Sequence, residues 1–200
     1  MKLFYSPTSP YVRKVSVIAE LTGLAGRIER VTPDFSPIKV NPELMAQNPL
    51  SKVPVLVRDD GTALYDSTVI CQYLDDLAGT GLYPKSGNLR WLVLRAEALA
   101  DGLLDAAVLM RYESNLRPAD KQWSDWCDGQ LRKVASALAE MEHELGSRPG
   151  LDAGHSATVV ALGYLRLRMA DMGWEKTHPK LAEWFAAMDE RPEFKSTRPA

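Results

Sequence analysis

The chain changes its hydrophobic pattern once, at a stretch between residues 79 and 87 that is rich in glycine, proline and serine. Before this stretch, short apolar runs typical of strands alternate with apolar patterns typical of helices. After it, apolar residues recur at the three- and four-residue spacing of helices. A cluster of Gly, Pro and Ser is typical of a linker. We therefore expect an α/β domain over residues 1–78, a linker over 79–87 and an all-helical domain over 88–200.

The first domain predicts the order strand, helix, strand, irregular connection, two strands and helix. Ser9 and Pro10 are typical of a helix N-cap and first helical position. The connection over 32–51 contains four prolines. Asp60 and Gly61 indicate a tight turn between antiparallel strands. The expected strands cover 2–5, 28–31, 53–57 and 62–65, and the expected helices cover 11–21 and 67–77.

Four helices are expected in the second domain. Apolar residues from Leu92 to Met110 are spaced by three or four, which is one face of a long helix that Pro118 ends. We expect His155 or Ser156 to cap the third of these helices. The four expected helices cover roughly 92–117, 131–145, 156–172 and 179–191.

Composition excludes several classes of function. The net charge of −2 and the pI near 6.0 give no electrostatic reason to expect nucleic acid or an anionic membrane as a partner. No apolar run approaches the ~20 residues that span a bilayer. The two cysteines, Cys71 and Cys127, form no paired motif, which suits a reducing cytoplasm. His143 is not followed by a second histidine at metal-site spacing, so we expect no metal.

Two short motifs indicate a site for a small extended peptide with an acidic end. Lys52, Val53 and Pro54 stand at a strand entrance, where a proline leaves its neighbour's backbone without the usual ladder partner. Asp66 and Ser67 open a helix, where free N–H groups and a hydroxyl favour an anion. Taken singly, each motif is more often a simple cap or strand edge.

With their order and spacing, these motifs resemble the glutathione transferase family over nearly the whole chain. The resemblance implies a thioredoxin-like amino-terminal domain followed by an all-helical one. The segments that carry it are Ser9 to Val15, Asn48 to Leu56, Tyr65 to Ile70 and His178 to Trp184 with Arg191-Pro192.

The resemblance also assigns roles in binding glutathione. Pro54 is expected to be cis and to expose the Val53 backbone to the cysteinyl part. Asp66, where the family more often has Glu, is expected to pair with the γ-glutamyl ammonium, and Ser67 with its carboxylate. Two lysines, Lys52 and less securely Lys39, are candidates for the glycyl carboxylate.

Ser9 matches the family's catalytic position. A free thiol has a pKa of ~8.5, so only about 3% is thiolate at pH 7. A hydroxyl donor at a helix N-terminus stabilises the thiolate, and we expect Ser9 to do so. Ser6 and Tyr5 are lesser candidates. Some relatives have a cysteine at this position for mixed-disulfide chemistry, and this chain does not.

The leading hypothesis is a cytoplasmic, homodimeric glutathione transferase that conjugates glutathione to a small hydrophobic electrophile, as in detoxification. Arg111 and Tyr112 are candidates for contacting the electrophile, and ordinary surface residues are the alternative. Rival hypotheses are a glutathione-dependent peroxidase or disulfide reductase, and a non-enzymatic binding or regulatory protein.

Overall fold

A computed structural model describes residues 1–34 and 36–199 of the chain. The chain divides into two compact units. The first comprises Met1–Tyr83 together with the tail from Lys195 on, and the second comprises Pro84–Phe194. We call them the thioredoxin-like unit and the helical unit. The first division lies inside the stretch expected to be a linker.

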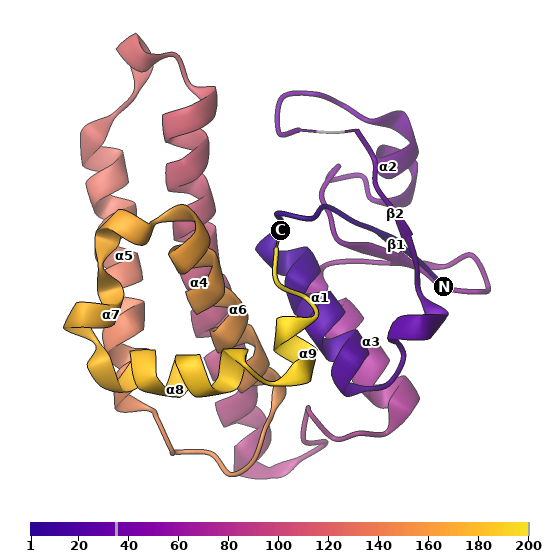
Figure 1. The fold of residues 1–200 in the computed structure, drawn as a ribbon. Coiled ribbons are helices and arrows are strands. Elements are labelled where there is room, and N and C mark those ends of the chain that lie inside the picture. The colour runs from indigo at the N-terminus through magenta and orange to yellow at the C-terminus, as the bar shows by residue number, and fades with distance from the viewer. Residues whose placement is uncertain (35, 200) are drawn as a thin grey trace. The chain divides into compact units, whose positions relative to one another are not determined.

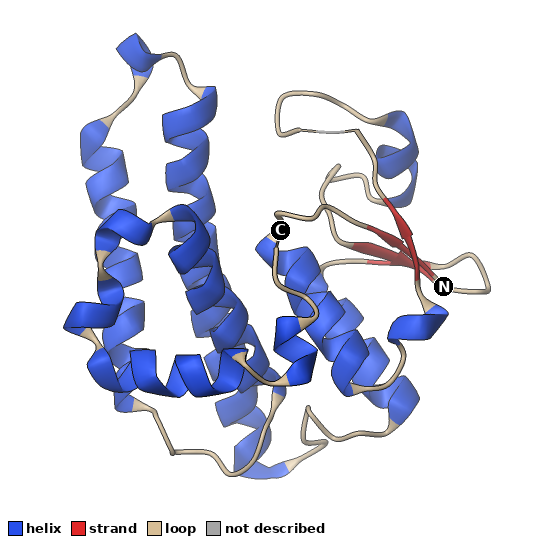
Figure 2. Ribbon diagram, in the orientation of Figure 1, coloured by secondary structure: helices blue, strands red, loops and turns tan. Residues whose placement is uncertain are grey.

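The thioredoxin-like unit is built on a four-stranded mixed sheet in the order β2-β1-β3-β4. The central strand β1 pairs in parallel with β2 and antiparallel with β3, which in turn pairs antiparallel with β4. Figure 2 shows the sheet in red among the helices. The elements are β1 Lys2–Phe4, α1 Pro10–Leu21, the 3₁₀ turn Ala25–Arg27, β2 Glu29–Val31, α2 Pro42–Gln47, β3 Val55–Val57, β4 Ala63–Leu64 and α3 Ser67–Ala78.

Side chains alternate across this sheet and bury both faces. Phe4 and Val55 are paired in register and pack with Leu44 of α2. Leu3 and Leu56, the next pair, point to the opposite face because successive residues of a strand alternate. There α1 and α3 pack against each other (Figure 1). Thus the sheet lies between α2 and the pair α1 and α3, as the predicted thioredoxin-like order requires.

The helical unit is formed around the long helix α4, which packs against α5 and α6, while α8 packs against both α5 and α6 (Figure 1). In its core, the rings of Trp174 and Phe185 meet edge to face with centroids 5.9 Å apart. The elements are α4 Gly87–Leu116, the 3₁₀ turn Ala119–Lys121, α5 Ser124–His143, α6 Ala153–Arg168, the 3₁₀ turn Ala170–Met172, α7 Trp174–Thr177, α8 Pro179–Asp189 and α9 Pro192–Lys195. Among the described helices, none combines the length and apolar character that crossing a membrane requires.

The start of α6 corrects a prediction. Neither His155 nor Ser156 caps this helix, which begins three residues earlier with Asp152 as its N-cap. The Asp152 carboxylate accepts a hydrogen bond of 2.8 Å from the His155 N–H and one of 2.9 Å from Nε of the buried Arg148. Burial raises the pKa of Asp152, but the bonds from His155 and the charge of Arg148 outweigh it and hold the pKa below its usual range.

We predict that Asp152→Asn destabilises the protein. An asparagine oxygen still caps α6, but the charge facing Arg148 is lost, so the free energy of unfolding at pH 7 should fall by about 1–3 kcal/mol in urea denaturation. Asp171→Asn, at an exposed position, is the control and should change little.

The loss of stability in Asp152→Asn should depend on pH. Because the folded state lowers the pKa of Asp152, its charge stabilises above the unfolded pKa, and that stability is lost as pH falls through the folded pKa. The difference between wild type and Asp152→Asn should therefore shrink in acid. A difference that stayed constant down to pH 3 would contradict this assignment.

Candidate functional site

The register of the sheet brings three predicted segments to one end of the thioredoxin-like unit. Phe4, the last residue of β1, pairs with Val55, the first of β3. Leu56 pairs with Leu64, the last residue of β4. The loop that follows β1, the segment that enters β3 and the segment that leaves β4 therefore all meet at this end. These three segments contain Ser9, then Lys52, Val53 and Pro54, then Asp66 and Ser67.

The Val53–Pro54 peptide bond is cis, as predicted. The ladder between β1 and β3 begins only at Val55. The side chain of Val53 packs against the core of Phe4, Leu44 and Val55. Its backbone N–H and C=O form no hydrogen bond within residues 1–34 and 36–199. Both groups can therefore pair with the backbone of an extended ligand.

A buried asparagine holds the segment before Val53, and sequence reasoning gave it no role. The Asn48 side chain is 2% exposed in the folded chain. Its amide donates to the Lys52 carbonyl at 3.0 Å, and its oxygen accepts from the Leu50 N–H at 3.0 Å. These two bonds close the turn in which Ser51 has a positive φ of 52°. Asn48 thereby fixes the direction of the chain as it reaches Lys52.

Asp66 and Ser67 form the N-terminus of α3. Asp66 is the N-cap, and one of its carboxylate oxygens accepts the Thr68 N–H at 3.0 Å. Ser67 is only 3% exposed, and its hydroxyl has no hydrogen-bond partner in the described part of the chain. The hydroxyl is not among the fully shielded groups that lack a partner, so a ligand can still reach it. The helix N-terminus beneath it favours an anionic partner.

Lys14 supports this helix terminus from α1, which sequence reasoning also missed. The side chain is almost fully buried, and its ammonium donates to the Thr68 hydroxyl at 3.2 Å. A lysine within an amphipathic helical pattern does not predict such a contact from sequence. The contact depends on the packing of α1 against α3.

Ser9 is the N-cap of α1, as the sequence indicates. Its hydroxyl oxygen accepts the Val12 N–H at 3.3 Å. A hydroxyl has one proton to donate besides two acceptor lone pairs, and no acceptor for this proton lies among the residues described. Capping the helix and donating to a ligand are therefore compatible for Ser9.

The two candidate lysines differ in their surroundings. Lys39 lies in the connection between β2 and α2 and forms an ion pair with Asp34. Lys52 is exposed and forms no ion pair within the described residues. The geometry thus brings Lys52 to the end of the sheet with its charge uncompensated, whereas Lys39 already has a carboxylate partner.

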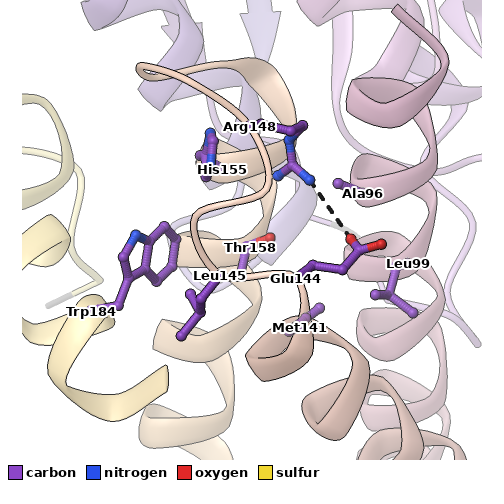
Figure 3. Close-up of a pocket in the computed structure, with 9 residues that line it drawn as sticks. All are labelled: Ala96, Leu99, Met141, Glu144, Leu145, Arg148, His155, Thr158 and Trp184. Atoms are coloured by element: carbon purple, nitrogen blue, oxygen red, sulfur yellow. Dashed lines mark ion pairs between the residues drawn. The ribbon is translucent and has the colours of Figure 1, made fainter. Parts of the chain in front are cut away.

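A pocket in the helical unit is distinct from these residues (Figure 3). Arg148 and Glu144 face each other across it at 3.7 Å, and the rings of His155 and Trp184 are 5.9 Å apart beside it. Its free space of about 20 Å³ is on the order of one water molecule. We regard it as part of the Asp152 network and not as a substrate site. No group of three or more potential metal ligands occurs within the described part of the chain.

Comparisons with known proteins identify the family of the chain. The model of the glutathione S-transferase N-terminal domain matches residues 8–77. An uncharacterized GST-like protein of Escherichia coli K12, YibF, is 31% identical over all of this chain and 98% of its own length. A glutathione transferase family member from Pseudomonas fluorescens Pf-5, solved with bound glutathione, has 43% identity and a TM-score of 0.94 over all of this chain and 98% of that one. The same organism's family member was also solved with S-(propanoic acid)-glutathione, at 42% identity and a TM-score of 0.92 over the whole of both chains.

The chain therefore belongs to the glutathione transferase family. Its fold class, a thioredoxin-like domain with a large helical region, is the one that the sequence predicted. The roles of single residues stay predictions.

We predict that Asn48→Ala destabilises the thioredoxin-like unit. Two buried hydrogen bonds are lost together, and the Lys52 carbonyl and Leu50 N–H lose their partner, so unfolding should become easier by about 1–3 kcal/mol. Thermal and urea unfolding measure the change. Asn88→Ala, at an exposed position in the first turn of α4, is the matched control. Equal stability of the two variants would argue against this role of Asn48.

Proposed function

We propose that the protein binds glutathione at the end of its sheet and transfers the glutathione thiolate to a small electrophile. One observation carries the proposal. The three segments at this end present the Val53 backbone, the Ser67 hydroxyl and the Ser9 hydroxyl proton, and none of these has a partner among the described residues. A free stretch of backbone and two hydroxyls match the groups of an extended, acidic peptide that contains a thiol.

Each part of glutathione has a chemical counterpart at the site. The Val53 backbone pairs with the cysteinyl residue as a short extended strand does. Ser67 and the N-terminus of α3 hold the γ-glutamyl carboxylate, and the second oxygen of Asp66 pairs with its ammonium. Lys52 holds the glycyl carboxylate, and Lys39 does so only if it leaves Asp34.

Ser9 activates the thiol. A charge-assisted hydrogen bond from its hydroxyl favours the thiolate, and the N-terminus of α1 adds a favourable dipole. Lowering a thiol pKa by two units requires about 2.7 kcal/mol of preferential stabilisation, which these two effects can supply. The thiolate sulfur then attacks the electrophile, and a new bond to sulfur forms as the leaving group departs or the acceptor's double bond is saturated.

Transfer is favoured over the rival functions. The Pseudomonas fluorescens relative solved with S-(propanoic acid)-glutathione supports conjugation, because that ligand carries a carbon substituent on sulfur. Reduction through a protein mixed disulfide has less support, because position 9 is serine and Cys71 is buried in α3. Family membership further favours a cytoplasmic homodimer with a role in detoxification. The turnover and binding experiments below distinguish enzymatic transfer from a non-enzymatic role.

Removing the Ser9 hydroxyl should raise the pKa of the bound thiol. We expect Ser9→Ala to raise it by about one to two units, since hydrogen bonds to charged groups contribute about 1.5–3 kcal/mol. Turnover with chloronitrobenzene substrates at pH 7 should fall accordingly. The ultraviolet absorbance of the thiolate, followed against pH in the complex, measures the pKa.

Two further variants separate chemistry from helix capping. Ser9→Gly should lose activity like Ser9→Ala, yet keep more stability, because glycine replaces a capping serine at a cost of only a few tenths of a kcal/mol. Ser6→Ala tests the neighbouring hydroxyl. A thiol pKa that stays low in both Ser9 variants and rises in Ser6→Ala would reassign the role.

Asp66→Asn should weaken glutathione binding about tenfold, since a lost charge-assisted contact is worth at least about 1.4 kcal/mol. Asparagine still accepts the Thr68 N–H, so α3 keeps its cap. Calorimetric titration measures the affinity. An analogue that lacks the γ-glutamyl amino group is the control, and it should bind wild type and variant alike. If wild type shows no saturable binding up to millimolar glutathione, the transferase hypothesis and the peroxidase or reductase hypothesis both fail.

A further inference from the structure

Thr68, in the first turn of α3, is contacted by an anion and by a cation. Its N–H donates to a carboxylate oxygen of Asp66 at 3.0 Å, and its hydroxyl accepts from the ammonium of Lys14 at 3.2 Å. Asp66 is the N-cap of the same helix, whereas Lys14 belongs to α1 and lies 54 residues earlier in the sequence. Two opposite charges therefore meet at the residue that follows the buried Ser67.

The free backbone donors of α3 flank Thr68. The first N–H groups of a helix have no partner within the helix. Here the Thr68 N–H donates to the Asp66 carboxylate, and the Ile70 N–H donates to the Asp66 carbonyl. The N–H groups of Ser67 and Val69 form no hydrogen bond within the part of the chain that the structure describes. An anion at this helix terminus would therefore meet donors on both sides of Thr68.

The packing of α1 against α3 does not by itself account for a cation at this position. The N-terminus of α3 is the positive end of the helix dipole, which disfavours a nearby cation and favours an anion. The Lys14 side chain is also only 1% exposed, and burying an ammonium costs free energy. An apolar pair could join the two helices without either cost. A bound anion offsets both, because it interacts favourably with the dipole and with the ammonium.

We propose that Lys14 is a positioning residue for the γ-glutamyl carboxylate of glutathione, and that it makes the site selective for peptides that carry this group. The inference rests on the glutathione binding of the proposed function and not on the transfer step. Lys14 acts through Thr68, because their bond fixes the turn whose N–H groups meet the carboxylate. Asp66 supplies the opposite charge for the ammonium. The terminus of α3 thus recognises the zwitterionic head of an α-amino acid.

Selectivity is measured with two peptides that differ in one group. 4-Aminobutanoyl-cysteinylglycine is glutathione without the α-carboxylate of its γ-glutamyl residue, and it keeps the amino group, the thiol and the glycyl end. Calorimetry gives the ratio of its Kd to that of glutathione, which we call the carboxylate selectivity. For wild type we expect a ratio of at least about ten, because the analogue lacks a charge-assisted hydrogen bond.

Removing either partner of the Lys14–Thr68 bond should lower this ratio. We expect Lys14→Gln and Thr68→Val each to reduce the carboxylate selectivity at least about threefold, by weakening the binding of glutathione and leaving that of the analogue nearly unchanged. Thr68→Ser keeps a hydroxyl for Lys14 and should retain most of the selectivity.

Two matched controls should leave the carboxylate selectivity intact. Thr22→Val removes a half-buried hydroxyl that donates to carbonyls at the end of α1. Lys2→Gln removes a charge from an exposed position at the other end of β1. A fall in either control as large as in Thr68→Val would overturn the proposal.

A double-mutant cycle tests whether Lys14 acts through Thr68. Both residues have further interactions besides their common bond, so a single variant does not isolate it. If the bond carries the effect, Lys14→Gln combined with Thr68→Val should lower the selectivity no more than the stronger single variant does. Losses that multiply in the double variant would contradict the proposal. An unchanged ratio in Thr68→Val would overturn it even if Lys14→Gln failed to fold.

A kinetic measurement separates this inference from the transferase function. With a chloronitrobenzene and varied glutathione, Lys14→Gln and Thr68→Val should raise KM for glutathione more than they lower kcat, because the γ-glutamyl head is remote from the thiol. Ser9→Ala should do the reverse. Carboxylate-selective binding without any turnover would sink the transferase function and leave the role of Lys14. Turnover by a wild type that binds both peptides equally would sink the role of Lys14 and leave the transferase.

Discussion

The antiparallel pairing of β1, β3 and β4 is the constraint on which the candidate glutathione site depends. Three segments that are spread over residues 9–67 of the sequence come to one end of the sheet because Phe4 pairs with Val55 and Leu56 with Leu64. A shift of one residue in the pairing of β1 with β3 would leave Phe4 and Val55 on opposite faces of the sheet, so one of them would turn away from Leu44. The burial of this small core therefore also determines where Ser9, Val53 and Ser67 stand relative to one another.

Much of this arrangement can be predicted from the sequence, because its signals are local. Ser9 followed by Pro10 gives the start of α1, and the Asp-Gly turn gives the antiparallel pairing of β3 with β4. The missed contributions depend on tertiary packing. Asn48 and Lys14 act only through neighbours that packing supplies. The start of α6 was placed three residues too late, because Asp152 precedes the apolar run and its capping role is clear only once Arg148 lies beside it.

Helix termini in the thioredoxin-like unit have two roles at once. Ser9 caps α1 with its oxygen lone pair and retains its proton, and Asp66 caps α3 with one carboxylate oxygen and retains the other. Stability and ligand binding thus use different atoms of the same side chain. This explains why the cap motifs are ambiguous in sequence: the residue types that end a helix well are also those that bind an anionic peptide. Only the groups without partners, such as the Ser67 hydroxyl, distinguish the two readings.

The helical unit poses the same question for its arginines. Arg168 is the last residue of α6, where the helix dipole favours a cation, and this alone accounts for a basic residue at that position. The dipole does not explain why Nε is shielded without an acceptor, nor why Arg111 of the neighbouring helix α4 adds a second positive charge near the same tyrosine. Burial raises the pKa of Tyr164 and the two arginine charges oppose this only in part, so the phenol stays a neutral donor beside them.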